Sequence, residues 1–283
     1  RDGRNRTRLR PFSSRTSRNQ PSSKASVLVN AAWVRNLVRP APGKALAWID
    51  WSQQEFGIAA ALSGDSAMLA AYKTGDPYMA FAIKASAAPI DATASTHADV
   101  RELFKACVLG VQYGMGASTL ARLTSLSEVA AQQLLSYHRS LFSGFWHWSD
   151  GVESRAWLLR RQTSVFGWQT HITDQTKPGF VRNFPMQANG AEMLRLACCL
   201  ATENGIDVCA PLHDALLIEA DEKEIHHAVD IAQQSMSEAS NIVLDGFALR
   251  TTCRLIPYPQ RFGDHRGAVV WSNVEQAING LGG

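Results

Sequence analysis

The chain has 283 residues, enough to bury a substantial hydrophobic core and to form one large domain or two modest ones. Hydrophobic residues make up 46% of it, which excludes an intrinsically disordered protein. No apolar run approaches the roughly 18 residues of a membrane span, and no signal-peptide hydrophobic region follows the first residues. We therefore expect no association with a membrane.

The net charge of +3 conceals an uneven distribution of charge along the chain. The basic arm, residues 1–24, holds eight Lys or Arg residues and one acid, whereas the whole chain holds 28 and 25. The remainder is therefore mildly acidic. Such an arm suits binding to a phosphate backbone. An Arg- and Ser-rich start with few acids also resembles an organellar transit peptide, which is the alternative.

The first predicted element is a short apolar strand at Ala45–Ile49, with Asp50 at its end. Catalytic carboxylates favour such positions, because a rigid strand presents the polar group at the edge of a sheet. An Asp that caps the following helix is the alternative. That helix is predicted by apolar residues that share one side: Phe56, Ile58, Ala59 and Leu62.

A polar loop, "SAAPIDATASTHAD", precedes a second predicted helix of about four turns. Thr96 and Asp99 have the spacing of a capping box at its start, and Gly114 and Gly116 end it. Arg101 and Lys105 lie four residues apart on this helix, so they repel each other by a few tenths of a kcal/mol. A bound anion between them would remove this penalty, whereas two solvated surface charges are the alternative. The apolar face consists of Val100, Leu103, Phe104, Cys107, Val108 and Val111.

Two hairpins are predicted further along the chain. One surrounds "TSVFGWQTHI" and leads into a loop, "QTHITDQTKPGFVRN". The other joins the strands "VCAPL" and "ALLIEA" at His213 and Asp214. An Asp at such a turn ordinarily caps its own backbone, and a catalytic role requires a second carboxylate close by.

The five cysteines lack CxxC spacing and lie in apolar contexts, which predicts reduced core residues of an intracellular protein; they are Cys107, Cys198, Cys199, Cys209 and Cys253.

Three segments in this order, "DWSQQE", "RELFKACVLGVQYG" and "LHDALLIEA", resemble motifs A, B and C of the family A DNA polymerases, the bacterial polymerase I type. The linking segments agree, because "FSSRTSRNQP" resembles the stretch before motif A and "RNFPMQANGAEM" resembles the helix before motif C. The resemblance extends from about residue 10 to at least residue 220. One motif would be weak evidence, whereas three in order with matching internal spacing are specific.

The resemblance implies template-directed DNA synthesis, in which a primer 3′-hydroxyl attacks the α-phosphate of a deoxynucleoside triphosphate. Two magnesium ions about 3.5 to 4 Å apart activate the nucleophile and stabilise the leaving group in such reactions. Asp50 and Asp214 are the expected magnesium ligands, because magnesium is held by one or two carboxylates together with substrate phosphates. The backbone carbonyl of Trp51 is a further candidate ligand. Primer-template DNA and deoxynucleoside triphosphates are the expected partners.

The same resemblance assigns the triphosphate to the second predicted helix. Lys105, which we count with the catalytic residues, is expected to face the α-phosphate and Arg101 the γ-phosphate. Tyr78 stands where the family often has a His on the β-phosphate, and a phenol without positive charge predicts a weaker contact. Leu109 stands near the sugar, where the family commonly has Phe or Tyr.

Sugar choice and duplex contacts are implied in the same way. Glu55 occupies the steric-gate position beneath C2′ of the nucleotide, and Tyr113 closes over it, which predicts a preference for deoxynucleotides. The expected contacts with the duplex read its shape and its shared acceptors rather than its sequence; they are Arg10, Asn19, Asn183, Gln187 and His213. From the residues alone the last three are an ordinary loop Asn, helix Gln and turn His.

The expected fold class is α+β, a polymerase palm with an antiparallel sheet and an inserted helical fingers subdomain. We expect the basic arm and thumb-to-palm remnant at 1–40, the palm at 41–70 and 181–283, and the fingers at 71–180. Family members usually carry a thumb and an exonuclease-like domain before this region. We therefore expect a piece of a longer protein, with the thumb largely absent, no exonuclease activity and a weak grip on duplex DNA.

The resemblance also implies a monomer in the cytoplasm of a bacterial cell or a phage-infected host. Motif C departs from the family at Ala215, where an acid usually follows the Asp, so we expect reduced metal affinity with activity retained. A single-subunit RNA polymerase shares both Asp positions, but Glu55 and the "LHDA" context favour DNA synthesis. A weak or inert nucleic-acid-binding remnant is a further possibility. A metal-dependent phosphoesterase is disfavoured, because no His-rich cluster accompanies the carboxylates.

Overall fold

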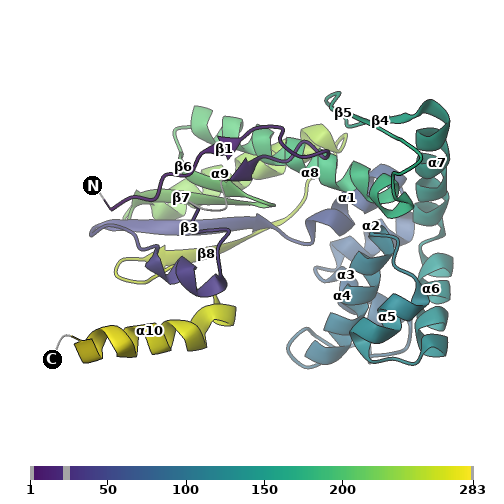
Figure 1. The fold of residues 1–283 in the computed structure, drawn as a ribbon, viewed down its shortest axis with the longest axis horizontal. Helices are drawn as coiled ribbons and strands as arrows, with labels where there is room; N and C mark the ends of the chain where they lie inside the picture. The colour runs from purple at the N-terminus through teal and green to yellow at the C-terminus, as the bar shows by residue number, and fades with distance from the viewer. Residues whose placement is uncertain (1–2, 22–25, 282–283) are drawn as a thin grey trace. The chain divides into compact units, whose positions relative to one another are not determined.

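The computed structural model describes residues 3–21 and 26–281, which divide into two compact units (Figure 1). Unit 1 comprises the described parts of Arg1–Ser52, Ala191–Ile242 and Ala248–Gly283, and unit 2 comprises Gln53–Gly190 and Val243–Phe247. Arg1, Asp2 and Lys24 of the basic arm lie outside the described residues. Within the described ranges, every helix is too short or too polar to cross a membrane. The boundaries expected for arm, palm and fingers stay a prediction.

Unit 1 is built on an antiparallel sheet of four strands in the order β6-β7-β3-β8 (Figure 1). The sheet confirms the strand expected before Asp50 and the hairpin around His213 and Asp214, and it confirms the α+β class. The strands are β3 (Lys44–Trp51), β6 (Asp207–Leu212), β7 (Ala215–Asp221) and β8 (Thr251–Pro257). The other elements are β1 (Leu9–Arg10), β2 (Gln20–Pro21), η1 (Ala32–Leu37), α9 (Ile225–Val243), η2 (His265–Gly267) and α10 (Ala268–Leu281).

The central strand β3 is apolar on both faces of the sheet. Because side chains alternate along a strand, Leu46, Trp48 and Asp50 share one face. Leu46 and Trp48 join a hydrophobic cluster that includes Leu28, Leu212, Leu217, Ile256 and Phe262. Trp51 lies on the opposite face, fully buried, and its Nε1 donates to the Met236 carbonyl of α9 over 3.3 Å. A slip of one residue would exchange the two faces and move Asp50 to the face on which Trp51 is buried, which disfavours other registers.

The described part of the basic arm is folded. Residues Leu9–Arg10 pair with Gln20–Pro21, and the intervening loop is held by Arg195 of α8 (Pro178–Glu203). The Arg195 guanidinium donates to the Ser17 carbonyl over 2.6 Å and to the Ser17 hydroxyl over 3.0 Å, and its Cζ lies 4.3 Å from the centroid of the Phe12 ring. The arm is therefore fixed to the helix that precedes the second hairpin of the chain.

Unit 2 is mostly helical and has an aromatic core. Phe81 and Phe142 pack at a centroid distance of 5.5 Å, and each also contacts the ring of His138. The helices are α1 (Gln54–Ser63), α2 (Ser66–Lys73), α3 (Pro77–Lys84), α4 (Ala98–Gln112), α5 (Ala117–Thr124), α6 (Glu128–Leu141), α7 (Ser143–Leu159) and the first part of α8. The hairpin predicted around "TSVFGWQTHI" is confirmed as β4 (Arg161–Thr163) and β5 (Gln169–His171).

Two local predictions are wrong. The 15-residue helix α4 has the predicted length, but its N-cap is His97, and no side chain caps it. Thr96 does not form the capping box, because its hydroxyl accepts from Thr93 N over 3.0 Å and so closes the preceding loop. All five cysteines are free thiols, as expected, but only Cys107 is buried in the core. Three are exposed: Cys199 on the surface of α8, Cys209 at the bulge in edge strand β6, and Cys253 in edge strand β8.

Candidate functional site

Unit 1 places Asp50 and Asp214 at the same end of two paired strands. In the β3/β7 register Asp50 faces Ala215, the residue that follows Asp214. The Trp51 backbone N–H donates to the Asp214 carbonyl oxygen over 3.1 Å, which ties the two positions together directly. The sheet thus brings side by side the backbones of two aspartates that are far apart in the sequence. This is the second carboxylate that a catalytic role for the turn aspartate requires.

Asp50 is held by strand β8 on its other side. Thr252, its partner in the β3/β8 register, donates its hydroxyl to Asp50 Oδ1 over 2.5 Å. The helix-capping alternative for Asp50 is excluded, because the N-cap of α1 is Gln53. The hydroxyl orients the carboxylate and leaves its Oδ2 for another ligand. Sequence reasoning missed Thr252, since no local pattern indicates which residue of a distant strand becomes its partner.

The pair of carboxylates fits magnesium better than a closed structural metal site. No cluster of three or more His, Cys, Asp or Glu side chains converges anywhere in the described ranges. Magnesium needs no such cluster, because one or two carboxylates and the phosphates of a substrate complete its oxygen shell. Ala215 is fully buried in β7 and adds no ligand. Whether Trp51 contributes its carbonyl stays a prediction.

The residues around the turn of the second hairpin are basic. His213 has a left-handed backbone, with φ at +57°, and its side chain lines a cavity of about 30 Å³ with Arg18, Asn19 and Arg195. Partial burial lowers the pKa of His213, and the positive charges of Arg18 and Arg35 lower it further. Asn19 Oδ1 accepts from Phe12 N over 3.3 Å, so it also shapes the loop of the arm. Arg10 is exposed in β1, and its expected contact with DNA stays a prediction.

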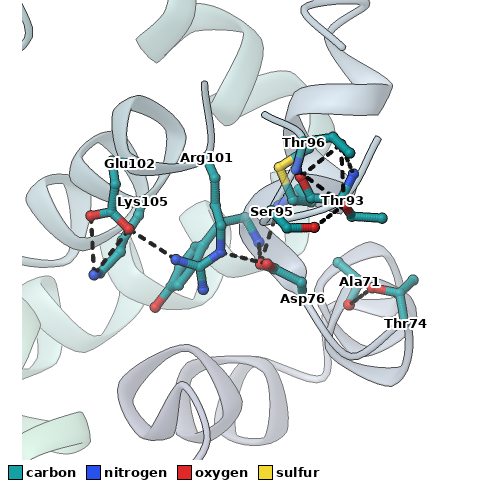
Figure 2. A network of polar contacts seen from close by, with 11 residues as sticks. Ala71, Thr74, Asp76, Thr93, Ser95, Thr96, Arg101, Glu102 and Lys105 are labelled. Atoms are coloured by element: carbon teal, nitrogen blue, oxygen red, sulfur yellow. Dashed lines mark hydrogen bonds and ion pairs between the residues drawn. The ribbon is translucent and has the colours of Figure 1, made fainter. Parts of the chain in front are cut away.

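Unit 2 places Arg101 and Lys105 on α4, where two acids accompany them (Figure 2). Arg101 Nε donates to Asp76 Oδ2 over 2.5 Å, and its Nη1 donates to Glu102 Oε1 over 2.9 Å. Lys105 Nζ lies 3.2 Å from Glu102 Oε2. Burial lowers the pKa of Arg101, but the hydrogen bond and charge of Asp76 outweigh this effect and raise it overall. The anion that the sequence places between the two cations is thus supplied by the protein itself.

Tyr78 lies beneath Arg101 and is 4% exposed. The Arg101 Cζ atom is 5.3 Å from the centroid of the Tyr78 ring, a cation–π arrangement. Burial raises the pKa of the phenol far above its usual value, so it stays protonated. The ring supports the guanidinium from below, and the expected contact of its hydroxyl with a phosphate stays a prediction. Leu109, two turns further along α4, is half-buried.

A directional chain of hydrogen bonds links three predicted site residues in unit 2. Gln187 Nε2 donates to the Tyr113 hydroxyl over 3.0 Å, and that hydroxyl donates to Glu55 Oε1 over 3.0 Å. Asn183 is buried instead, and its Nδ2 donates to the Gln112 carbonyl over 3.4 Å. The structure therefore brings Glu55, Tyr113 and Gln187 together, while Asn183 supports the end of α4.

The backbone at Tyr113 is anchored by two glycines. Gly114 has φ at +72°, which a residue with a side chain rarely adopts. A Cβ atom on Gly179, in the first turn of α8, would collide with the Tyr113 carbonyl oxygen, and one on Gly114 would lie 3.1 Å from Gly179 Cα. The two chain segments therefore touch backbone to backbone. Only glycine permits this approach.

Asp76 and Glu102 were missed by the sequence analysis, although both carry a local signal. Asp76 followed by Pro77 is typical of a helix start, with the acid at the N-cap and the proline at the first helical position. Glu102 lies three residues before Lys105 on one helix, a spacing that favours an ion pair. Both signals indicate structure rather than function, so neither one alone would have placed these acids on the two cations.

Comparison with known proteins indicates the family of the chain. The family described as DNA polymerase family A matches residues 23–252. DNA polymerase I of Aquifex aeolicus is 28% identical over 226 residues, covering 75% of this chain and 38% of its own length. The DNA polymerase of Mycobacterium phage D29 is 26% identical over 245 residues, covering 85% of this chain and 40% of its own length. The chain thus spans about two fifths of the length of these relatives.

A solved structure supports the fold. The POL domain of Pol1 from M. smegmatis, in complex with DNA primer-template and dNTP, is similar with a TM-score of 0.81 and 21% sequence identity, over 95% of this chain and 49% of that one. The family match begins at residue 23, after most of the basic arm, so the expected role of the arm stays a prediction. The match covers far more than half of the chain and contains both aspartates, α4 and the β6–β7 hairpin, and the chain belongs to DNA polymerase family A.

Proposed function

We propose that the chain catalyses template-directed DNA synthesis, the transfer of a nucleotide from a deoxynucleoside triphosphate to a primer 3′-hydroxyl. The observation that carries the proposal is the position of Asp50 and Asp214 at one end of paired strands, joined by the bond from Trp51 N to Asp214 O. Membership of the family supports the reaction type, and the carboxylate pair supplies the groups that the reaction needs.

Asp50 and Asp214 are the groups that would hold magnesium. Bound magnesium would supply charge stabilisation for the attacking and leaving oxygens. Thr252 holds Asp50 Oδ1, so the carboxylate is oriented before any ligand arrives. Such preorganisation lowers the cost of binding, because fewer side chains have to be ordered. With Ala215 in place of an acid, we expect weak affinity for the metal rather than loss of the reaction.

Arg101 and Lys105 are the groups that would bind the triphosphate. A guanidinium and an ammonium on one helix face neutralise negative charge as it moves toward the leaving pyrophosphate. Glu55, held by Tyr113, would exclude the 2′-hydroxyl of a ribonucleotide. His213, Asn19 and Gln187 would contact the primer-template duplex, with Arg10 on its phosphates. A monomer is sufficient for these roles.

A second candidate function is binding of nucleic acid without synthesis. Ala215 favours it, because the expected third acid is missing. Glu102 favours it as well, since it occupies both cations expected to bind triphosphate. Both proposals predict binding of primer-template DNA, and only the first predicts extension of the primer.

Primer extension by the purified chain tests the proposal. A single primer-template is supplied with magnesium and either deoxy- or ribonucleotides, and the extended product is quantified with time. We expect extension with deoxynucleotides, loss of extension on chelation of the metal, and loss in Asp50→Asn and Asp214→Asn. An amide keeps the shape of the carboxylate but loses the charge that holds magnesium.

The matched control is Asp221→Asn, which removes an acid from the opposite end of β7. Asp221 pairs with Lys44 in an exposed ion pair, so its loss should leave extension and stability nearly unchanged. Duplex binding and circular dichroism of all variants establish that the fold is retained. Extension by either aspartate variant near the rate of the unsubstituted chain would refute the assignment, and binding without any extension by the unsubstituted chain would favour the second candidate.

A further inference from the structure

Arg101 and Lys105 are formally neutralised by Asp76 and Glu102. Two positive and two negative side chains form one connected network on α4 and the start of α3 (Figure 2). An anion that binds the two cations therefore meets a site whose charge is already balanced. Adding an anion to all four groups would leave an excess of negative charge, and displacement of one internal carboxylate removes that excess.

Asp76 is fixed in place by three hydrogen bonds. Its Oδ1 accepts from the backbone N–H groups of Tyr78 over 3.1 Å and Met79 over 3.3 Å, which makes it the N-cap of α3. Its Oδ2 accepts from Arg101 Nε over 2.5 Å, and both side chains are largely buried, at 25% and 19% exposure. The Tyr78 ring lies under the same guanidinium. Arg101 is thereby oriented through Nε, which leaves its terminal nitrogens to face another partner.

Glu102 is held much less firmly. Its side chain is 59% exposed, and the contacts it makes in the described structure are with the two cations. Its Oε1 accepts from Arg101 Nη1 over 2.9 Å, and its oxygens lie 3.2 and 3.4 Å from Lys105 Nζ. Exposed ion pairs of this kind contribute little to stability. A rotation of the Glu102 side chain into solvent would release Arg101 Nη1 and Lys105 together.

We propose that Asp76 is a positioning residue that holds Arg101 for the triphosphate, and that Glu102 is a displaceable counterion that occupies Arg101 and Lys105 until the triphosphate replaces it. The inference rests on the proposed function for the identity of the anion. Asp76 stays bound during the exchange, because the helix terminus and the guanidinium hold both of its oxygens. Glu102 competes with the nucleotide, so it lowers the apparent affinity of Arg101 and Lys105 for a triphosphate.

The two acids are therefore expected to have opposite effects when they are neutralised. Glu102→Gln removes the competitor and should tighten anion binding, whereas Asp76→Asn removes the group that orients Arg101 and should weaken it. Asparagine is an equally good N-cap, so Asp76→Asn retains the bonds to Tyr78 and Met79 and loses only the charged contact with Arg101. A purely electrostatic role for both acids predicts tighter binding in both variants, since each gains one unit of positive charge.

The test uses inorganic tripolyphosphate as the probe and the whole chain as the protein. Titration calorimetry measures the dissociation constant of tripolyphosphate for the unsubstituted chain, Asp76→Asn, Glu102→Gln and the control Asp99→Asn. Asp99 is an exposed acid on the same helix, so its substitution changes the net charge equally. We expect binding about two- to fivefold tighter for Glu102→Gln, about tenfold weaker for Asp76→Asn, and within about twofold of the unsubstituted chain for Asp99→Asn.

A second measurement follows KM for the deoxynucleotide and kcat in primer extension. Loss of positioning should raise KM and lower kcat together in Asp76→Asn, whereas Glu102→Gln should lower KM with kcat nearly constant. Tighter tripolyphosphate binding in both variants, or no change in either, would overturn the inference. The calorimetry does not depend on synthesis, so a chain that binds tripolyphosphate with these opposite shifts but extends no primer would refute the proposed function and leave the exchange intact.

Discussion

The hydroxyl of Tyr113 donates to Oε1 of Glu55, so the residue at the end of α4 holds the carboxylate at the start of α1 in one orientation. Gln187 donates to the same hydroxyl from α8, which fixes the direction of the proton in the Tyr113–Glu55 bond. A steric gate works only if it cannot move aside. This chain of bonds gives the proposed gate two supports from outside its own helix.

Glu55→Ala should raise the use of ribonucleotides relative to deoxynucleotides by on the order of tenfold or more, because the variant lacks the group proposed to exclude the 2′-hydroxyl. Tyr113→Phe should change the ratio in the same direction but less, since it removes only the bond that orients Glu55. The measurement is the ratio of kcat/KM for the two sugars. Glu203→Ala, an exposed change on α8, serves as the control, and an unchanged ratio in Glu55→Ala would remove this residue from the gate.

Lys105→Ala should slow nucleotide incorporation by roughly 100-fold, as expected for loss of a charge that stabilises the transition state. Binding of primer-template DNA should change by less than about twofold, because the proposed partner of Lys105 is the triphosphate and not the duplex. Single-turnover incorporation and fluorescence anisotropy measure the two effects. The exposed Lys73 on α2 gives a matched Lys→Ala control. Equal losses in both assays would instead indicate that α4 contacts the duplex.

Leu109→Tyr should relax discrimination against dideoxynucleotides. Leucine offers no hydroxyl to replace the missing 3′-hydroxyl of a chain terminator, whereas tyrosine does. A hydrogen bond in a desolvated site contributes roughly 1 to 3 kcal/mol, which corresponds to a change of about 5- to 150-fold in the ratio. The quantity to measure is the ratio of dideoxy to deoxy incorporation efficiency, in which a general loss from overpacking cancels. Identical ratios for the two proteins would mean that α4 does not place this residue at the sugar.

His138 should make the stability of unit 2 sensitive to acid. The ring is 1% exposed, its Nδ1 accepts from Trp146 Nε1 over 3.1 Å, and burial lowers its pKa to about 3. An unfolded chain binds a proton at this residue below about pH 6.5, whereas the folded chain does not until about pH 3. The free energy of unfolding should therefore fall between pH 6.5 and 3, by up to about 1.4 kcal/mol per pH unit from this group.

Urea unfolding across this pH range measures the slope. His138→Gln keeps an acceptor for Trp146 without titrating, so its unfolding free energy should depend less steeply on pH. His226→Gln removes an exposed histidine of α9 and should leave the slope as it is in the unsubstituted chain. The same slope in His138→Gln would show that other groups dominate the acid sensitivity.

The elements with a strong local signal were predictable from the sequence. The β3 strand, the β6–β7 hairpin and α4 follow from apolar runs and periodicity. The predicted capping box did not form, because the Thr96 hydroxyl bonds to the backbone N–H and carbonyl of Thr93 within the loop. The two hydrogen-bond patterns compete for the same hydroxyl, and residue spacing alone does not indicate which one forms. The prediction that the cysteines lie in the core failed for the three exposed ones, because apolar neighbours in sequence do not indicate which face of a strand or helix a residue occupies.

The partners within the candidate site were less predictable than the site residues themselves. The resemblance to motifs A and C indicated Asp50 and Asp214, but Thr252 reaches Asp50 only through the strand order of the sheet. Asp76 and Arg101 meet because α3 and α4 pack together, which no periodicity encodes. Long-range pairing depends on the whole fold, so the sequence indicates the candidate site residues and leaves out the residues that orient them.

The close approach of Gly179 to the Tyr113 carbonyl involves the backbone of Tyr113, whereas the contacts with Glu55 and Gln187 involve its side chain. The main chain of Tyr113 packs directly against Gly179, which has no side chain, whereas the phenol hydroxyl bonds to Glu55 and Gln187. Substitution at 113 can therefore alter what the side chain does while the main chain stays where it is. Replacement of Gly179, by contrast, would force the start of α8 and the end of α4 apart. In the proposed gate, a single substitution at 113 can therefore change sugar preference without a compensating change in the main chain around it.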